Sequence, residues 1–162
     1  MDDHTRDPTV DPPPPGQNPT GWLPEENRWE HDTLRRAVIH GVRLFNSGEY
    51  HDSHDCFEDE WFNYGNGTLE KKFLQGMVQV AAGAYKATVR ENESGLRKLF
   101  TTGRGYLSDV PADFYGIDVD GVRDAVESTL AEPTEFDEWT ITLDGETPKA
   151  RPEDEDFAKA LP

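Results

Sequence analysis

The stretch from Phe73 to Tyr85 contains thirteen residues and no charge. At 3.6 residues per turn its large apolar side chains share one broad face, and the opposite face carries only glutamine, glycine and alanine. A helix without a charged face is normally buried on all sides, and this stretch is too short to span a membrane. Its small residues, Gly76 and Gly83 among them, would let neighbouring helices approach closely. The stretch therefore predicts the central helix of an antiparallel bundle, extending over about 69–90.

The same helical periodicity predicts four more helices around the central one. They cover residues 34–47, about 49–62, about 95–108 and about 119–131. Residues that can cap helix N-termini precede four of the five helices: Asp32, Thr68, Ser94, and either Asp118 or Asp120. The sequence thus predicts an all-α fold, a compact bundle of about five helices around a buried third helix.

Charge and proline divide the chain into a helical domain and two tails. The 162 residues include 33 acidic and 16 basic side chains, a net charge of −17, and most of this excess lies in residues 1–31 and 132–162. The predicted organisation is a proline-rich acidic tail over 1–31, a helical domain over 32–131 and an acidic tail over 132–162. Within the tails, residues 1–21 and 145–162 are expected to be disordered.

A short extended segment is expected near residues 136–143, where Trp139, Ile141 and Leu143 alternate. This segment would dock onto the bundle or onto another subunit, so that a homo-oligomer is one expected assembly. Trp22 and Trp29 in the N-terminal tail are further aromatic side chains that can contact a small-molecule ligand or a partner. The alternative, slightly preferred, is that these flanking segments only cover hydrophobic surface of the bundle.

The composition excludes several classes of function. No uncharged stretch approaches the ~20 residues of a membrane-spanning helix, and the acidic N-terminus lacks the apolar core of a secretory signal, so we expect no membrane association and a cytoplasmic protein. The single cysteine, Cys56, provides neither an internal disulfide nor a cysteine zinc site. The negative charge repels nucleic acid, and no basic patch offsets it. The acidity indicates either an acidic tail that binds a partner or adaptation to a high-salt cytoplasm. Acidic residues throughout the chain, with lysine scarce, favour the second.

The helix predicted over 49–62 combines histidines and carboxylates with aromatic residues that mark its apolar side. At 100° per residue, His54 and Glu58 fall inside that apolar arc, and Glu60 points away from it. Because a buried carboxylate needs partners, we expect a polar cluster between the second and third helices. Its predicted members are His51, His54, Asp55, Glu58, Trp61, Gln75, Gln79 and Tyr85.

Several stretches of the chain resemble the "domain of unknown function 309" family. In chain order they are Leu44-Phe45-Asn46-Ser47-Gly48-Glu49-Tyr50, His54-Asp55, Glu58, Trp61, Phe73-Leu74-Gln75-Gly76-Met77-Val78-Gln79 and Gly116-Ile117-Asp118-Val119. The resemblance covers about residues 32–131 and implies a compact all-helical fold, with no reaction assigned to the family. Two positions depart from the family pattern, since Asp55 replaces a glutamate and Ser53 an alanine. A role that depends on a glutamate carboxylate at position 55 is therefore not implied.

Three roles are compatible with the predicted cluster. The leading hypothesis is a binding or scaffold domain in which the cluster is a structural hydrogen-bonded network, because no nucleophile accompanies the histidine and the acid. The enzyme alternative is a small-molecule hydrolase or lyase in which His54 and Glu58 act as acid and base. The third role is a divalent metal site, with His51, His54, Asp55 and Glu58 as ligands. The sequence requires no cofactor, and the metal is the weakest reading because a closed site normally needs four ligands.

Overall fold

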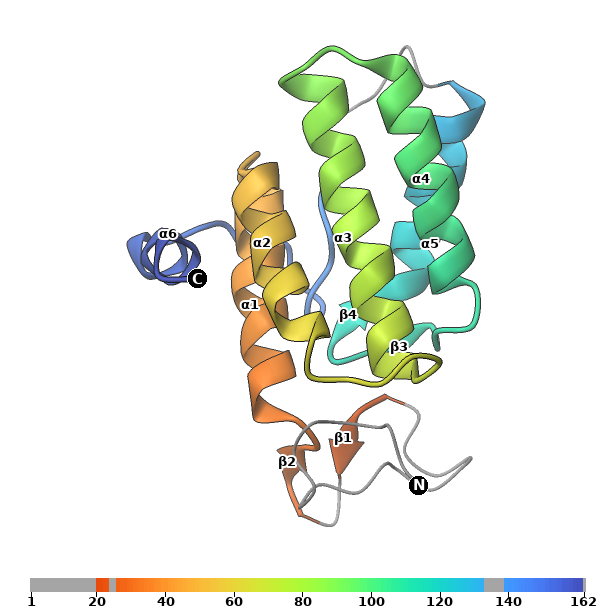
Figure 1. Ribbon diagram of the computed structural model, residues 1–162. Coiled ribbons are helices and arrows are strands. Elements are labelled where there is room, and N and C mark those ends of the chain that lie inside the picture. The colour runs from red at the N-terminus through yellow and green to blue at the C-terminus, as the bar shows by residue number, and fades with distance from the viewer. Residues whose placement is uncertain (1–19, 24–25, 133–138, 162) are drawn as a thin grey trace.

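The computed structural model describes residues 20–23, 26–132 and 139–161, which form helices and a few very short strands (Figure 1). In chain order the elements are β1 (Trp22–Leu23), β2 (Arg28–Trp29), α1 (Asp32–Asn46), α2 (Tyr50–Trp61), α3 (Leu69–Thr88), α4 (Glu93–Leu107), β3 (Asp113–Phe114), β4 (Ile117–Asp118), α5 (Val119–Ala131) and α6 (Pro152–Lys159). Helices α1 to α5 run alternately up and down and make up the bundle. The predicted all-α fold is confirmed, with one helix more than expected.

Helix α3 lies at the centre of the bundle, between α2 and α4 (Figure 1). At two positions a neighbouring side chain occupies the space that a β-carbon would need. A Cβ on Gly76 would lie 2.6 Å from the side chain of Leu107, and a Cβ on Gly83 would lie 2.5 Å from that of Phe100. The prediction of a central helix with closely packed neighbours is confirmed.

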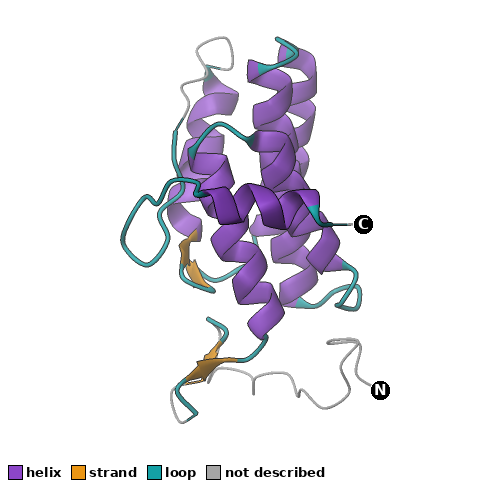
Figure 2. Ribbon diagram, turned by 90° about the vertical axis from the view of Figure 1, so that its left-hand side faces the viewer, coloured by secondary structure: helices purple, strands orange, loops and turns teal. Residues whose placement is uncertain are grey.

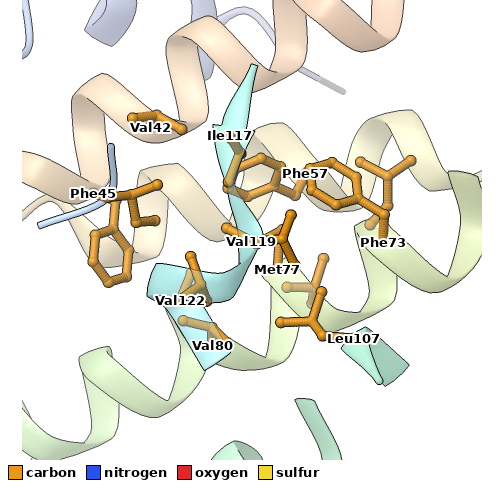
Figure 3. Close-up of a cluster of buried hydrophobic side chains, with 14 of the residues drawn as sticks. Val42, Phe45, Phe57, Phe73, Met77, Val80, Leu107, Ile117, Val119 and Val122 are labelled. Carbon is orange, nitrogen blue, oxygen red and sulfur yellow. The ribbon is translucent and has the colours of Figure 1, made fainter. Parts of the chain in front are cut away.

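The hydrophobic core draws side chains from all five bundle helices. Figure 3 shows part of this cluster, whose labelled members are Val42, Phe45, Phe57, Phe73, Met77, Val80, Leu107, Ile117, Val119 and Val122. Burial of apolar surface contributes about 25 cal/mol per Å², so this shared core is the main source of stability. It also fixes the helix faces that remain available for polar groups.

Two of the predicted N-terminal caps are confirmed and two are wrong. Thr68 accepts a hydrogen bond from a backbone nitrogen of α3, and Asp118 does the same for α5. Helix α1 already includes Asp32, so this residue is not its cap. Helix α4 begins before Ser94, and Asn92 caps it instead, because an asparagine two residues upstream is an equally good N-cap.

The C-terminal residues differ from the predicted disordered tail over 145–162, because residues 152–159 form α6. The helix crosses the outside of the bundle and contacts α1 and α2 (Figure 2). The signals for it were present in the sequence. Pro152 stands at the first helical position, acids occupy the first turn and Lys159 lies in the last turn.

A buried carboxylate attaches α6 to the bundle. Asp154 Oδ1 lies 2.7 Å from His40 Nδ1 and 3.4 Å from Arg43 Nη1, and Asp154 is fully buried. The ring of Phe157 stacks on the ring of His40 with 4.1 Å between centroids. Beside these contacts, Ala158 forms a small apolar cluster with α1 and α2 residues Leu44 and Cys56.

The described part of the predicted extended segment lies against the bundle. The amide of Asn46 holds it, since Nδ2 donates to the carbonyl oxygens of Ile141 and Pro148 at 2.9 and 3.0 Å. Its Oδ1 accepts from the backbone nitrogen of Ile141 at 2.6 Å. Residues 133–138, which include the start of the predicted segment, lie outside the described residues.

A short hairpin precedes α1 within the predicted N-terminal tail. Strands β1 and β2 pair antiparallel, with Trp22 opposite Trp29. Trp29 stacks on Tyr115 at 5.3 Å, and the backbone nitrogen of Tyr115 donates to the carbonyl of Thr20 at 2.8 Å. The hairpin therefore covers the end of the bundle at which α1 and α3 begin. The predicted disordered segment 1–21 lies outside the described residues except for its last two.

Candidate functional site

The histidines and carboxylates predicted on α2 lie together on one side of that helix. His54 Nδ1 lies 2.9 Å from Asp55 Oδ1, and His54 Nε2 lies 3.7 Å from Glu58 Oε2. His51 Nδ1 lies 3.4 Å from Asp55 Oδ2, and its ring makes an edge contact with Tyr85 of α3 at 5.5 Å. Asp55 therefore links the two histidines. These four α2 residues are called the α2 cluster below.

The α2 cluster is not buried, so the prediction that His54 and Glu58 face the core is wrong. Their side chains are 23% and 41% exposed. The buried residues of α2 are instead Tyr50, Ser53, Cys56, Phe57 and Glu60. Phe62, which helped to define the predicted apolar arc, follows the last residue of α2 and is 59% exposed. Without it the apolar arc turns away from Glu58 and toward Glu60.

The remaining predicted members do not complete one cluster. Gln75 and Gln79 on α3 are half-buried, and among the described residues neither forms a hydrogen bond with the α2 cluster. Trp61 packs against the edge of the core, with Lys71 Nζ 5.5 Å from its ring centroid. Its indole nitrogen is buried without a hydrogen-bond partner in the described part of the chain. Only Tyr85 joins the α2 cluster, through its contact with His51.

The α2 cluster, with Asp52, offers two sets of three possible metal ligands on one partly exposed helix face. His51, Asp52 and Asp55 form one set, and His54, Asp55 and Glu58 form the other, with ligand atoms within 4.8 Å in each. Exposed ion pairs of this kind contribute about 0–1 kcal/mol each to stability. The catalytic and metal roles predicted for this cluster stay predictions.

A second group of titratable side chains lies inside the protein, at the end of the bundle that the hairpin covers. Glu30 and His31 follow β2, and Glu70 stands in the first turn of α3. His31 Nε2 lies 3.7 Å from Glu30 Oε1 and 3.7 Å from Glu70 Oε2. The side chains of Glu30, His31 and Glu70 are 2%, 4% and 6% exposed, respectively. These three residues are called the buried centre below.

Further polar side chains surround the buried centre. Glu60 Oε2 accepts hydrogen bonds from Thr33 Oγ1 at 2.8 Å and from the Tyr64 hydroxyl at 2.7 Å. The ring of Tyr64 meets the ring of His31 edge-on at 5.2 Å. On the other side, the Tyr115 hydroxyl accepts a hydrogen bond from the backbone nitrogen of His31 at 3.2 Å. Residues from the hairpin, α1, α2, α3 and the β3–β4 turn therefore meet in one buried polar network.

The two tyrosine hydroxyls of this network stay protonated. Burial raises the pKa of Tyr64, and the charge of Glu60 raises it further. Burial also raises the pKa of Tyr115, with the charges of Glu70 and Glu30 as the next causes. Both phenols are therefore neutral at any physiological pH. The dependence of Tyr115 on three carboxylates, Glu60 included, also shows how closely their charges are gathered.

Local sequence patterns do not reveal the buried centre, for a physical reason. Glu30 and His31 were assigned to a tail, and the prediction that Glu60 points away from the core is wrong. Glu70 gave no signal, because an acid in the first turn of a helix is ordinary. The only local signal is that Tyr64 follows Glu60 by four residues, just beyond the end of α2, where one further helical turn would place both side chains on one face.

A pocket of about 540 Å³ opens on the other side of the hairpin. Its polar and aromatic lining comes from the hairpin, the β3–β4 turn and the C-terminal segment: Trp22, Trp29, Asp113, Asp118 and Asp144, with Thr20 and Thr142. The two indole rings lie 5.0 Å apart in an edge-to-face arrangement. Asp144 pairs with Arg35, whose guanidinium also lies over the ring of Trp29 at 4.7 Å. This surface is called the aromatic–acidic pocket below.

Comparison with known proteins supplies a family and no activity. None of the described helices is long and apolar enough to cross a membrane. No curated protein shows significant similarity to the chain. A family model described as Domain of unknown function (DUF309) matches residues 38–99, which contain all of α2 and α3 and the adjoining parts of α1 and α4. The resemblance seen in the sequence is thus confirmed over residues 38–99, which match this family model.

Proposed function

We propose that this protein is a binding domain whose aromatic–acidic pocket takes a ligand with a positively charged nitrogen. The observation that carries the proposal is the lining of that pocket, where two indole rings and three aspartates surround about 540 Å³. Indole faces attract ammonium and guanidinium groups, and carboxylates supply the opposite charge. A pocket of this volume suits a small molecule or a single basic side chain.

The protein contains an internal example of the proposed contact. The guanidinium of Arg35 lies 4.7 Å from the ring centroid of Trp29 and pairs with Asp144. The same kinds of group, an indole face and a carboxylate, are repeated in the pocket by Trp22 and Asp113. Asp113 is exposed, so its charge is available to a ligand that enters from solvent.

A titration of tryptophan fluorescence with choline and with L-arginine tests the proposal. We expect saturable quenching that sodium chloride at the same ionic strength does not produce. Asp113→Asn should weaken the binding by about tenfold, since a cation held between an aromatic face and a carboxylate loses one of two attractions. Asp124→Asn, an exposed aspartate on α5 outside the pocket, is the matched control and should bind like the unaltered protein. Equal binding by the two variants contradicts the proposal.

The enzyme alternative, a hydrolase or lyase using His54 and Glu58, has weaker support. The two side chains approach to 3.7 Å, as an acid–base pair needs, but none of the residues that line the aromatic–acidic pocket lies on α2. Within this proposal the α2 cluster is a solvated network that steadies α2 against α3 through His51 and Tyr85.

We also propose that the protein works in a concentrated salt solution inside the cell. The support is a net charge of −17 with 33 acidic side chains in 162 residues. At low ionic strength these charges repel one another over about 10 Å or more. Thermal unfolding followed by circular dichroism should therefore show a melting temperature that rises with KCl concentration. A melting temperature that is indifferent to KCl contradicts this part of the proposal.

A further inference from the structure

The buried centre brings together one imidazole and two carboxylates that come from distant parts of the chain. Glu30 and His31 are adjacent, and Glu70 lies about forty residues further on, at the start of α3. The ligand atoms of all three lie within 4.8 Å of one another. The three side chains are almost fully buried, which distinguishes them from the two partly exposed sets of residues on α2.

The spacing between the imidazole and the two carboxylates of the buried centre is close to that of ligands around a metal ion. Both distances from His31 Nε2 to the glutamate oxygens are 3.7 Å, longer than the ~3.2 Å limit of a good hydrogen bond. Two ligand atoms that bind one zinc ion at about 2.0–2.2 Å with a tetrahedral angle lie about 3.4 Å apart. The two distances from His31 therefore need only a small contraction to hold an ion, and all three ligand atoms already lie within 4.8 Å of one another.

The charge of the surroundings favours a cation in the same place. Glu60, which accepts hydrogen bonds from Thr33 and Tyr64, adds a third buried carboxylate to Glu30 and Glu70. Three carboxylates gathered at one place create a site that attracts a cation. A divalent cation at the centre would offset two of these charges at once.

We infer that Glu30, His31 and Glu70 form a binding site for one divalent transition-metal ion. An imidazole nitrogen with two carboxylate oxygens suits Zn²⁺, Mn²⁺ or Fe²⁺, whereas Ca²⁺ and Mg²⁺ prefer oxygen ligands alone. Three protein ligands leave at least one coordination position for water or for an oxygen of a bound molecule. Glu60 and the hydroxyl of Tyr64 form the hydrogen-bonded shell beside the site.

Such an ion would also tie the hairpin to the bundle. Glu30 and His31 end the hairpin segment, and Glu70 belongs to α3, so the metal would crosslink the hairpin segment and α3. Binding to the folded chain alone stabilises it in proportion to the logarithm of the free metal concentration. Metal binding is therefore expected to raise the melting temperature.

The test uses the full chain purified without a histidine tag, treated with chelator and then titrated with ZnCl₂ and, separately, with MnCl₂. Isothermal titration calorimetry should give one site per chain, and the melting temperature should rise with added zinc. Glu70→Gln, which keeps the shape of the side chain, should weaken zinc binding by at least about 100-fold and abolish the thermal shift. Circular dichroism reports whether this variant is folded.

The α2 cluster is the competing site, and Asp55→Asn is the matched control for it. Asp55 belongs to both sets of possible ligands on α2, so this variant disables the α2 cluster and leaves the buried centre intact. We expect Asp55→Asn to bind zinc like the unaltered protein. Loss of zinc in Asp55→Asn with retention in Glu70→Gln overturns the inference, as does the absence of any site in the unaltered protein.

X-ray absorption on the zinc-loaded, unaltered protein gives a readout that needs no variant. The buried centre predicts one imidazole and otherwise oxygen ligands around the zinc. Two imidazoles would identify His51 and His54 on α2 as the ligands and would overturn the assignment. Because none of these residues lines the aromatic–acidic pocket, failure of the metal site leaves the proposed binding function unaffected.

Discussion

The reactivity of Cys56 reports whether α6 is docked, and Asp154→Asn is the substitution that should release the helix. The Cys56 thiol is buried in an apolar cluster to which α6 contributes Ala158, with Phe157 packed against it. Asp154 is the only buried acid of α6 and contacts His40 and Arg43 of α1. Replacing its carboxylate by an amide removes the charged half of both contacts.

The expected magnitude follows from the contacts of Asp154. Hydrogen bonds to a charged group contribute about 1.5–3 kcal/mol each, and the 3.4 Å contact with Arg43 is at the weak end, so the variant should lose about 3 kcal/mol of docking free energy. That loss raises the population with α6 undocked about 100-fold. If alkylation of Cys56 requires undocking, its rate should rise by the same factor.

The docked state itself protects the thiol strongly. Burial, together with the charges of Asp52 and Asp55, raises the pKa of Cys56 to about 12. Because this pKa lies about three pH units above the ordinary value of 9.0, the fraction of Cys56 present as thiolate at neutral pH is about 1000-fold lower. Reaction through the docked state is therefore slow enough for the undocked population to dominate the rate.

Iodoacetamide labelling at pH 8, followed by intact-mass spectrometry, measures this rate. Asp156→Asn is the control, because Asp156 lies on the same helix and is exposed. We expect it to react like the unaltered protein. Equal labelling rates for Asp154→Asn and Asp156→Asn, with unchanged circular dichroism, would refute the idea that the buried carboxylate holds α6 over the thiol.

Three further predictions concern the α2 cluster, alkaline pH and the packing of α3. Glu58→Gln should lower the free energy of unfolding by less than about 1 kcal/mol in urea titrations, because its side chain is 41% exposed; a loss above about 3 kcal/mol would mean that it is a buried structural group. The raised pKa of Cys56 means that the protonated thiol contributes to the free energy of unfolding fully below pH 9, and that this contribution is lost as the pH rises toward 12. Between these two pH values the free energy of unfolding of the unaltered protein should therefore fall by up to about 4 kcal/mol more than that of Cys56→Ala. Gly76→Ala should destabilise the protein by about 1–3 kcal/mol, whereas Gly105→Ala, where a β-carbon meets nothing within 4 Å, should stabilise it by up to about 1 kcal/mol in the same thermal assay.

Periodicity predicted the bundle well because the information it needs is local. The uncharged stretch from Phe73 to Tyr85 identified α3 as central, and its glycines identified the close contacts with α4. Thr68 and Asp118 marked two helix starts correctly. Each of these features depends on neighbours within about one or two turns of the same helix.

The face of α2 was mispredicted because its apolar residues are few. Phe62 follows the helix end, yet it was counted as part of the helix and rotated the predicted arc toward Glu58. Ser53 and Glu60 take buried positions that a hydrophobicity pattern cannot assign to polar residues. Ser53 is accommodated because its hydroxyl donates to the carbonyl of Gly41 at 2.7 Å, and Glu60 because it accepts two hydrogen bonds. Such burial depends on partners in other elements, which no local pattern contains.

The aromatic–acidic pocket and the buried centre differ in how many of their residues lie within the family match. Every residue that lines the aromatic–acidic pocket lies outside residues 38–99. The buried centre is mixed, since Glu70 lies inside the matched range and Glu30 and His31 lie before it. A chain that shared only the matched segment would retain α2 and α3 but would have neither the pocket nor a complete buried centre. We therefore expect cation binding and metal binding only in chains that have the hairpin and the C-terminal segment. A relative without these flanking segments should bind neither choline nor zinc at the equivalent places.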